Sequence, residues 1–214
     1  MKAGDGVLLI WNDIAAGSEA AFRAWHDEEH IPERMGVPGF LHGRRFFGAE
    51  AAPRWLTVYE AEAPSVFSSA PYRARLDRPS PRTSAILPSF RATERMAGHV
   101  VAATGWGRGP HMAAVRLRLP DGASGLEGLL DRLRPGEGLV SAAVVAADMA
   151  GTAVRTAEKD LRTGDRDPPD AALLIEAADP EAALLAAASI LPPAGDAHVA
   201  VDRYRLEFGP SAAS

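Results

Sequence analysis

The chain has 214 residues, 47 % of them hydrophobic and 24 % charged, which is the composition of a folded globular protein with one large or two small domains. It has no cysteine, which excludes disulfides, thiolate metal sites and cysteine nucleophiles. Its 23 basic residues are outnumbered by 28 acidic ones and form no basic run, which argues against a nucleic-acid partner. No apolar run reaches the roughly 18 residues of a transmembrane helix. We therefore expect a cytoplasmic protein without a membrane partner.

Hydrophobic runs bounded by Gly, Pro and Ser predict the order βαββαβ in the first half of the chain. These elements lie at 7–11, 18–30, 40–47, 55–59, 64–77 and 89–96. The first helix should begin at Ser18, a favourable N-cap residue. It should end near His30, because Pro32 disfavours the helical conformation at Ile31.

The second half repeats that order with fewer aromatic residues. Its elements lie at 111–119, 126–133, 139–147, 171–177, 179–190 and 198–208. Alternation of apolar residues with arginine predicts that the first of these strands is half-buried, and Asp179-Pro180 predicts the start of a helix. The fold class expected is α+β: two ferredoxin-like units in tandem, whose four-stranded antiparallel sheets face each other as a barrel within one chain. The domain boundaries predicted are 1–98 and 111–214, joined by a Gly-rich linker at 99–110.

Large aromatic side chains are concentrated in the first half. All four tryptophans precede residue 107. Such side chains supply large, rigid contact surfaces. We therefore expect the main pocket in the first half, between residues 22–35 and the strands at 40–47 and 55–60.

The densest group of chemically active residues lies on the first helix. At 100° per residue, His26, Glu29 and His30 share the arc that carries Phe22 and Trp25. A carboxylate in the middle of an apolar face is difficult to explain by packing alone. The segment is therefore the candidate site for acid–base chemistry.

Structural roles for these residues remain open. Glu29 would also suit a buried ion pair with Arg44 or Arg45. His30, expected in the last helical turn, would suit a histidine that holds loop carbonyls, and the helix dipole there would favour its protonated form. His26 and His30 have the spacing of a zinc-binding histidine pair, but the zinc-hydrolase motif requires a glutamate directly after the first histidine. Asp27 occupies that position and no third ligand is evident, so a zinc hydrolase is disfavoured.

Several segments resemble one known family. They are Glu29-His30-Ile31-Pro32-Glu33-Arg34, Val37-Pro38-Gly39-Phe40, the run 53–60 and Ser69-Ala70-Pro71-Tyr72. Together they resemble the EthD-like branch of the dimeric α+β barrel superfamily over residues 6–96. The resemblance implies ferredoxin-like sheets that pair into a barrel, a pocket between sheet and helices, and His30 as the counterpart of the family's histidine. The second half lacks the Glu-His-Ile-Pro segment, so we interpret it as a degenerate copy that replaces the dimer partner.

Relatives in this superfamily include cofactor-independent monooxygenases, decarboxylases and polyketide-type cyclases. The resemblance thus implies acid–base chemistry on an aromatic or polyketide-like small molecule, without a metal or cofactor. We expect His30, oriented by Glu29, to act as the acid or base, with His26 beside it. The expected pocket walls are Trp25, Phe46, Trp55 and Tyr59. The alternative is a non-catalytic small-molecule-binding or stress-related module. The chain is expected to be a monomer or a homodimer.

Overall fold

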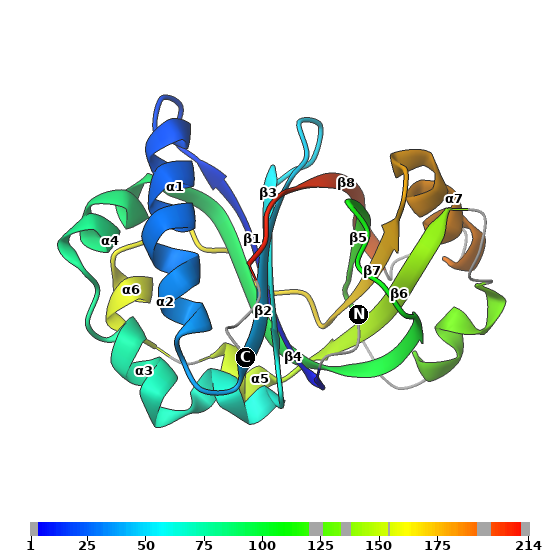
Figure 1. Cartoon of the computed structure of the whole chain (residues 1–214), viewed down its shortest axis with the longest axis horizontal. Coiled ribbons are helices and arrows are strands. Elements are labelled where there is room, and N and C mark those ends of the chain that lie inside the picture. The colour runs from blue at the N-terminus through cyan, green and yellow to red at the C-terminus, as the bar shows by residue number, and fades with distance from the viewer. Residues whose placement is uncertain (1–3, 120–125, 134–137, 154, 192–197, 211–214) are drawn as a thin grey trace.

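A computed structural model describes residues 4–119, 126–133, 138–153, 155–191 and 198–210 of the chain. Within these ranges eight strands form one closed antiparallel barrel, in the order β1-β3-β2-β8-β5-β7-β6-β4 (Figure 1). The strands are β1 (Gly6–Ile14), β2 (Phe40–Phe47), β3 (Trp55–Ala61), β4 (Phe90–Gly105), β5 (His111–Leu117), β6 (Leu139–Ala147), β7 (Ala171–Ala177) and β8 (His198–Phe208).

Helices cover the outside of the barrel on two opposite sides (Figure 1). The α-helices are α1 (Glu19–Trp25), α2 (Ile31–Met35), α3 (Ala70–Leu76), α4 (Pro81–Ile86), α5 (Met149–Thr152), α6 (Ala157–Asp160) and α7 (Pro180–Ile190). The π-helical turn η1 (His26–His30) joins α1 to α2, and 3-10 turns lie at Pro64–Ser68, Leu87–Ser89 and Glu127–Arg132. In the described ranges, no helix is both long and apolar enough to cross a membrane.

Both halves of the chain use the same strand order, β4-β1-β3-β2 in the first and β8-β5-β7-β6 in the second. The expected α+β barrel within one chain is confirmed, but its two four-stranded groups are not two sheets that only face each other. The edges of the two four-stranded groups pair with each other, β2 with β8 and β4 with β6, and so close one continuous sheet. Closure satisfies the backbone N–H and C=O groups that a free edge strand would leave unpaired.

Strand β4 is longer than expected and serves both groups of strands. Its first part pairs with β1, and its second part, Gly98–Gly105, pairs with β6. It therefore runs through most of the segment 99–110, which we expected to be a linker. The connection to β5 consists of residues 106–110.

The barrel interior is filled by apolar side chains from both halves. Members of this core include Trp11 and Phe46 from the first half and Met112, Leu174 and Tyr204 from the second. The two outer faces carry separate cores beneath the helices.

Strand β5 is buried on both faces, so the half-buried strand predicted at 111–119 is a wrong expectation. Its outer face packs in the core beneath α7. Arg116 is buried because it donates to Glu94 and to Asp202, at 2.9 Å in each case. A guanidinium paired with two carboxylates can be buried where a single charge could not.

The first helix does not end at His30. Ile31 is helical (φ −63°, ψ −48°), and its N–H bonds to the carbonyl of His26, five residues back. Pro32 then lies in the first turn of α2, where its missing N–H costs little. Because of the π turn, the helical segment continues through Pro32. His30 therefore lies within a continuous helical segment and not at its end.

Candidate active site

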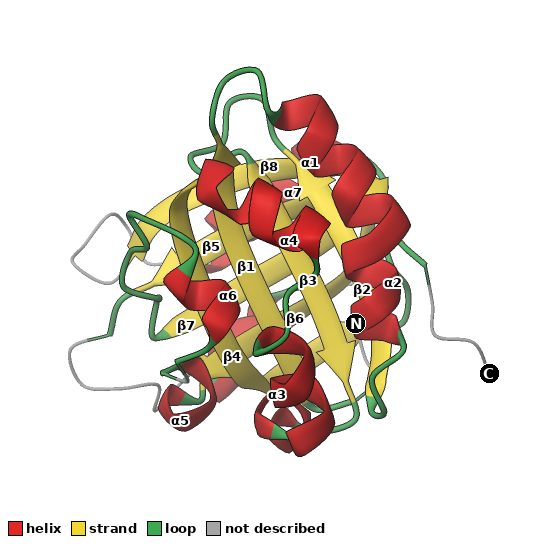
Figure 2. Cartoon of the chain, turned by 90° about the vertical axis from the view of Figure 1, so that its left-hand side faces the viewer, coloured by secondary structure: helices red, strands yellow, loops and turns green. Residues whose placement is uncertain are grey.

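A narrow cavity lies between the helices of the first half and the outer face of the sheet, on the side seen in Figure 2. It has about 30 Å³ of free space, roughly the volume of one water molecule in the liquid. Its lining includes residues of the helical segment 25–34 and of β1, β3 and β4. It is lined by Ile10, Asn12, Trp25, His26, His30, Arg34, Thr57, Tyr59, Tyr72, Leu76, Leu87, Phe90, Arg95, Glu158 and Arg162. The position between helix and sheet agrees with the expected pocket.

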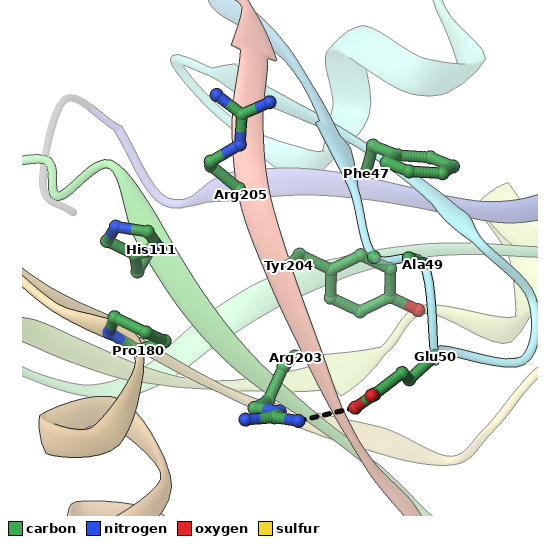
Figure 3. Close-up of a pocket in the computed structure, with 9 residues that line it drawn as sticks. Phe47, Ala49, Glu50, His111, Pro180, Arg203, Tyr204 and Arg205 are labelled. Atoms are coloured by element: carbon green, nitrogen blue, oxygen red, sulfur yellow. Dashed lines mark hydrogen bonds and ion pairs between the residues drawn. The ribbon is translucent and has the colours of Figure 1, made fainter.

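A larger hollow exists elsewhere, so the expectation that the main pocket lies in the first half is wrong as to size. An open groove of about 440 Å³ follows the seam between β2 and β8 (Figure 3). Two of its polar side chains have partners: Arg203 pairs with Glu50, and the Tyr204 hydroxyl donates to the carbonyl of Pro53 at 2.8 Å. The groove is wide and open to the surface, unlike the narrow cavity.

His30 is buried in the wall of the narrow cavity. Its ring lies against Trp25, with centroids 4.3 Å apart, and stacks on His26 at 5.2 Å. Burial lowers the pKa of His30 well below its usual value, and the positive charge of Arg34 lowers it further. The imidazole is therefore neutral at pH 7, which corrects the expectation that a helix dipole keeps it protonated. Its buried Nδ1 has no hydrogen-bond partner among the described residues.

His26 shares the cavity wall but has a fixed partner. Arg45 Nη1 lies 3.3 Å from His26 Nδ1. A guanidinium can only donate, so Nδ1 accepts and the ring proton is on Nε2. Burial and the charge of Arg45 lower the pKa of His26 well below its usual value. His26 is thus a neutral, oriented ring that supports His30 by stacking.

The hydrogen-bond partners of Glu29 differ from the arginines expected. Its carboxylate accepts hydrogen bonds from the hydroxyls of Ser80 and Thr83, at the start of α4. Arg44 and Arg45 pair instead with Glu176, Glu60, Asp27 and Glu207. The carboxylate therefore neither forms the expected ion pair nor bonds to His30 in the structure, and it holds α4 against the first helix.

Tyr59 lines the cavity from strand β3. It lies opposite Gly43 on β2, and a Cβ at Gly43 would come within 2.9 Å of the Tyr59 ring. The glycine thus leaves room for the ring to lie across the neighbouring strand. Burial raises the pKa of Tyr59 far above its usual value, so the hydroxyl stays protonated. No acceptor or donor in the described part of the chain bonds to that hydroxyl.

Two of the expected wall residues lie outside the cavity. Phe46 is on the opposite face of the sheet, in the barrel interior. Successive residues of a strand point to opposite faces of the sheet, and the Phe46 side chain is on the face that lines the barrel interior. Trp55 packs with Phe22 and Phe47 in the core beneath α1. The structure brings together Trp25, His26, His30 and Tyr59 only.

Four charged residues in the lining were not among the sequence-based candidates. The signal for Arg34 was its spacing: His26, His30 and Arg34 follow one another at intervals of four residues, which places them on one face of a helix. Arg95 comes from β4, whereas Glu158 and Arg162 come from the connection between β6 and β7. No local pattern indicates that this connection crosses to the first half. In the described ranges, no three His, Asp or Glu side chains are grouped to hold a metal ion.

No protein-family model matches the chain, and no curated protein matches its sequence. Solved structures do match it. An anthrone oxidase-like protein superposes with a TM-score of 0.61 at 11 % identity, over 100 % of this chain and 95 % of that one. A candidate monooxygenase from Lactobacillus acidophilus gives 0.58 at 9 % identity, over 97 % of both chains. A heme-binding protein from Thermus thermophilus gives 0.53 at 9 % identity, over 95 % of this chain and 91 % of that one.

The chain shares the α+β barrel fold of these structures. Identities this low show the fold alone, because one fold hosts many unrelated activities. All eight strands of the barrel belong to one polypeptide.

Proposed function

We propose that the chain is an enzyme of the dimeric α+β barrel type that moves a proton between His30 and an aromatic or polyketide-like small molecule. The observation that carries the proposal is His30 itself: a buried, neutral imidazole in a cavity wall, whose Nδ1 has no partner in the described residues. A neutral imidazole with an open lone pair is a general base.

Burial, and after it the charge of Arg34, oppose a positive charge on the imidazole. The part of this penalty that Arg34 causes is offset when the proton transfer leaves a negative charge on the substrate beside the same arginine. The Tyr59 hydroxyl is a further donor for an enolate or phenolate oxygen. Proton transfer from a carbon or oxygen acid is a step that monooxygenase-, decarboxylase- and cyclase-like reactions share, and it needs no cofactor.

The finer relationships are also proposals. We propose that the chain is a tandem ferredoxin-like duplication of the EthD-like branch, with residues 1–98 carrying the site and 111–214 a degenerate copy. The repeated strand order of the two halves supports this. We also propose a cytoplasmic location. Because one chain closes its own barrel, we propose that the protein is a monomer or a homodimer.

The test is proton exchange at an acidic C–H bond. Anthrone, which has such a bond and is named in one structural neighbour, is incubated with the protein in D₂O without oxygen, and deuterium incorporation is followed by NMR. We expect the protein to accelerate exchange and His30→Gln to lower the rate about 10²–10⁴-fold, the usual weight of a general base. The matched control is His99→Gln, because His99 is exposed on β4.

Equal rates for the wild type and His30→Gln on a panel of such carbon acids would contradict the enzymatic proposal. The narrowness of the cavity is the observation that favours the alternative, a binding module. In that case the panel compounds would bind without any exchange above the buffer rate.

A further inference from the structure

The lining of the narrow cavity has an unbalanced charge. It contains three guanidinium groups, from Arg34, Arg95 and Arg162, but one carboxylate, from Glu158. Glu158 forms an ion pair with Arg34. Buried charges are normally paired, because an unpaired charge loses its hydration without compensation. The imbalance therefore indicates room for an additional negative charge.

The positive charge that remains belongs to Arg95. Its Nη1 donates to the backbone carbonyl of Gly151 at 3.0 Å, and no carboxylate in the described ranges pairs with it. The charge of Arg162 is compensated, because it pairs at 3.1 Å with Asp165, which lies outside the cavity lining.

Each of the three arginines also has a buried nitrogen without a hydrogen bond among the described residues. These atoms are Arg34 Nη1, Arg95 Nη2 and Arg162 Nε. A carboxylate oxygen of Glu33 lies 3.8 Å from Arg34 Nη1, too far for a hydrogen bond. A buried donor without an acceptor is costly, so three around one cavity indicate a missing acceptor.

Much of the remaining lining is aromatic, from Trp25, Tyr59, Tyr72 and Phe90. Flat apolar walls with a cluster of guanidinium groups fit a planar ring that carries a carboxylate, because guanidinium binds carboxylate through parallel hydrogen bonds.

We propose that the substrate of this cavity is an aromatic carboxylate, whose carboxylate group is bound by Arg34, Arg95 and Arg162. This proposal deepens the proposed function, and the claim that the ligand is a substrate rests on that function. The binding site itself is argued from the arginines alone. Glu158 is then an internal competitor: it places the same chemical group on Arg34 while the cavity is closed.

The cavity must open to admit such a ligand, since its free space is about that of one water. The element that closes it is the segment 156–166 of the second half, whose helix α6 lies among the first-half helices in both views (Figures 1 and 2). The Arg34–Glu158 ion pair connects this segment to the first half. Two backbone N–H groups of the segment also donate to the first half: Ala157 N–H to Asp77 Oδ1 at 3.3 Å, and Arg166 N–H to the carbonyl of Thr93 at 2.8 Å. Displacing Glu158 from Arg34 removes the charged contact of this cover segment.

Calorimetric titration with benzoate, and with benzamide as its neutral isostere, tests the proposal on the full chain. We expect benzoate to bind and benzamide to bind at least tenfold more weakly. Arg95→Gln should weaken benzoate binding about tenfold or more, as expected for loss of a charge-assisted hydrogen bond. Glu158→Gln should strengthen it by a similar factor, because the variant removes a competing negative charge and keeps a hydrogen-bond acceptor for Arg34.

Arg203→Gln is the control, since it makes the same change of net charge in the distant groove between β2 and β8. It should leave benzoate affinity unchanged. The proposal is overturned if the folded protein does not bind benzoate, if benzamide binds equally well, or if Arg203→Gln weakens benzoate as much as Arg95→Gln. Benzoate has no proton for His30 to remove, so His30→Gln should still bind it. A failure of the anion site and a failure of the proton-transfer proposal are thus separate results.

Discussion

Two stacked histidines in one cavity wall have different chemical roles. Arg45 occupies Nδ1 of His26, whereas Nδ1 of His30 has no partner in the part of the chain that the structure describes. Both rings are neutral because burial and neighbouring arginines disfavour the imidazolium form. We therefore propose His30 as the reactive ring, because its Nδ1 is not engaged by another group.

Glu29 is expected to be a stability residue. Ser80 caps α4 by accepting from the N–H of Thr83 at 2.9 Å, and both hydroxyls donate to Glu29. Glu29→Ala should lower the free energy of unfolding by about 1.5–3 kcal/mol, the usual loss for hydrogen bonds to a charged group. It should not cause the roughly 10²–10⁴-fold loss of exchange rate that removal of a general base causes.

Denaturant unfolding and the anthrone exchange assay measure the two effects of Glu29→Ala separately. Glu28→Ala is the control, because Glu28 pairs on the surface with Arg82 and such exposed pairs contribute little. An exchange rate that falls as far in Glu29→Ala as in His30→Gln would show that the carboxylate orients the base after all.

Among the secondary-structure elements, the bounds of half of the strands were predictable, whereas the phase of the first helix was not. The strands at 40–47, 139–147, 171–177 and 198–208 have the predicted ends, because β-branched, aromatic and alanine-rich runs stop at glycine, proline or aspartate. The position of Glu29 was wrong because a uniform 100° per residue does not hold through a π turn. A π turn inserts one residue into the helix, and nothing in the local sequence signals where.

The Tyr59 ring can lie close to the backbone of β2 only because residue 43 is a glycine. A Cβ there would lie 2.9 Å from the Tyr59 ring and 3.1 Å from Met35 Sδ. Gly43→Ala should therefore destabilise the protein by about 1–3 kcal/mol, the usual cost of overpacking, and move the Tyr59 ring.

Thermal unfolding and the Tyr59 ring resonances in NMR test this prediction. Gly128→Ala is the matched control, since a Cβ there meets only Asp131 Oδ2, at 3.6 Å. A Gly43→Ala protein as stable as the wild type, with unchanged Tyr59 resonances, would show that the ring does not depend on the glycine.

At the scale of the whole molecule, buried ion clusters join the two halves across the barrel interior. One connects Arg44 of β2 to Glu176 of β7. The other connects Arg116 of β5 to Glu94 of β4 and Asp202 of β8. These contacts, like the crossing of Glu158 and Arg162 to the first-half cavity, join residues far apart in the chain. Sequence periodicity describes single elements, so it predicted the barrel strands but none of these partners.

Arg116→Leu should destabilise the protein by about 3–5 kcal/mol, because it leaves two buried carboxylates without their cation. The triple variant Arg116→Leu/Glu94→Gln/Asp202→Asn should recover most of that loss, since no uncompensated charge remains. Denaturant unfolding measures both. A single variant that is as stable as the triple variant would contradict the role assigned to this cluster.

An NMR titration of the His30 imidazole measures whether His30 is a neutral base at pH 7. The resonance is assigned by its loss in His30→Gln. Burial and the charges of Arg34, His26 and Arg162 all act to lower the pKa of His30. We predict that its titration midpoint lies below the ordinary value of about 6.5, so the ring is deprotonated throughout the neutral range and loses its function as a base only as the pH falls through that lowered pKa. A midpoint at or above 6.5 would contradict the claim.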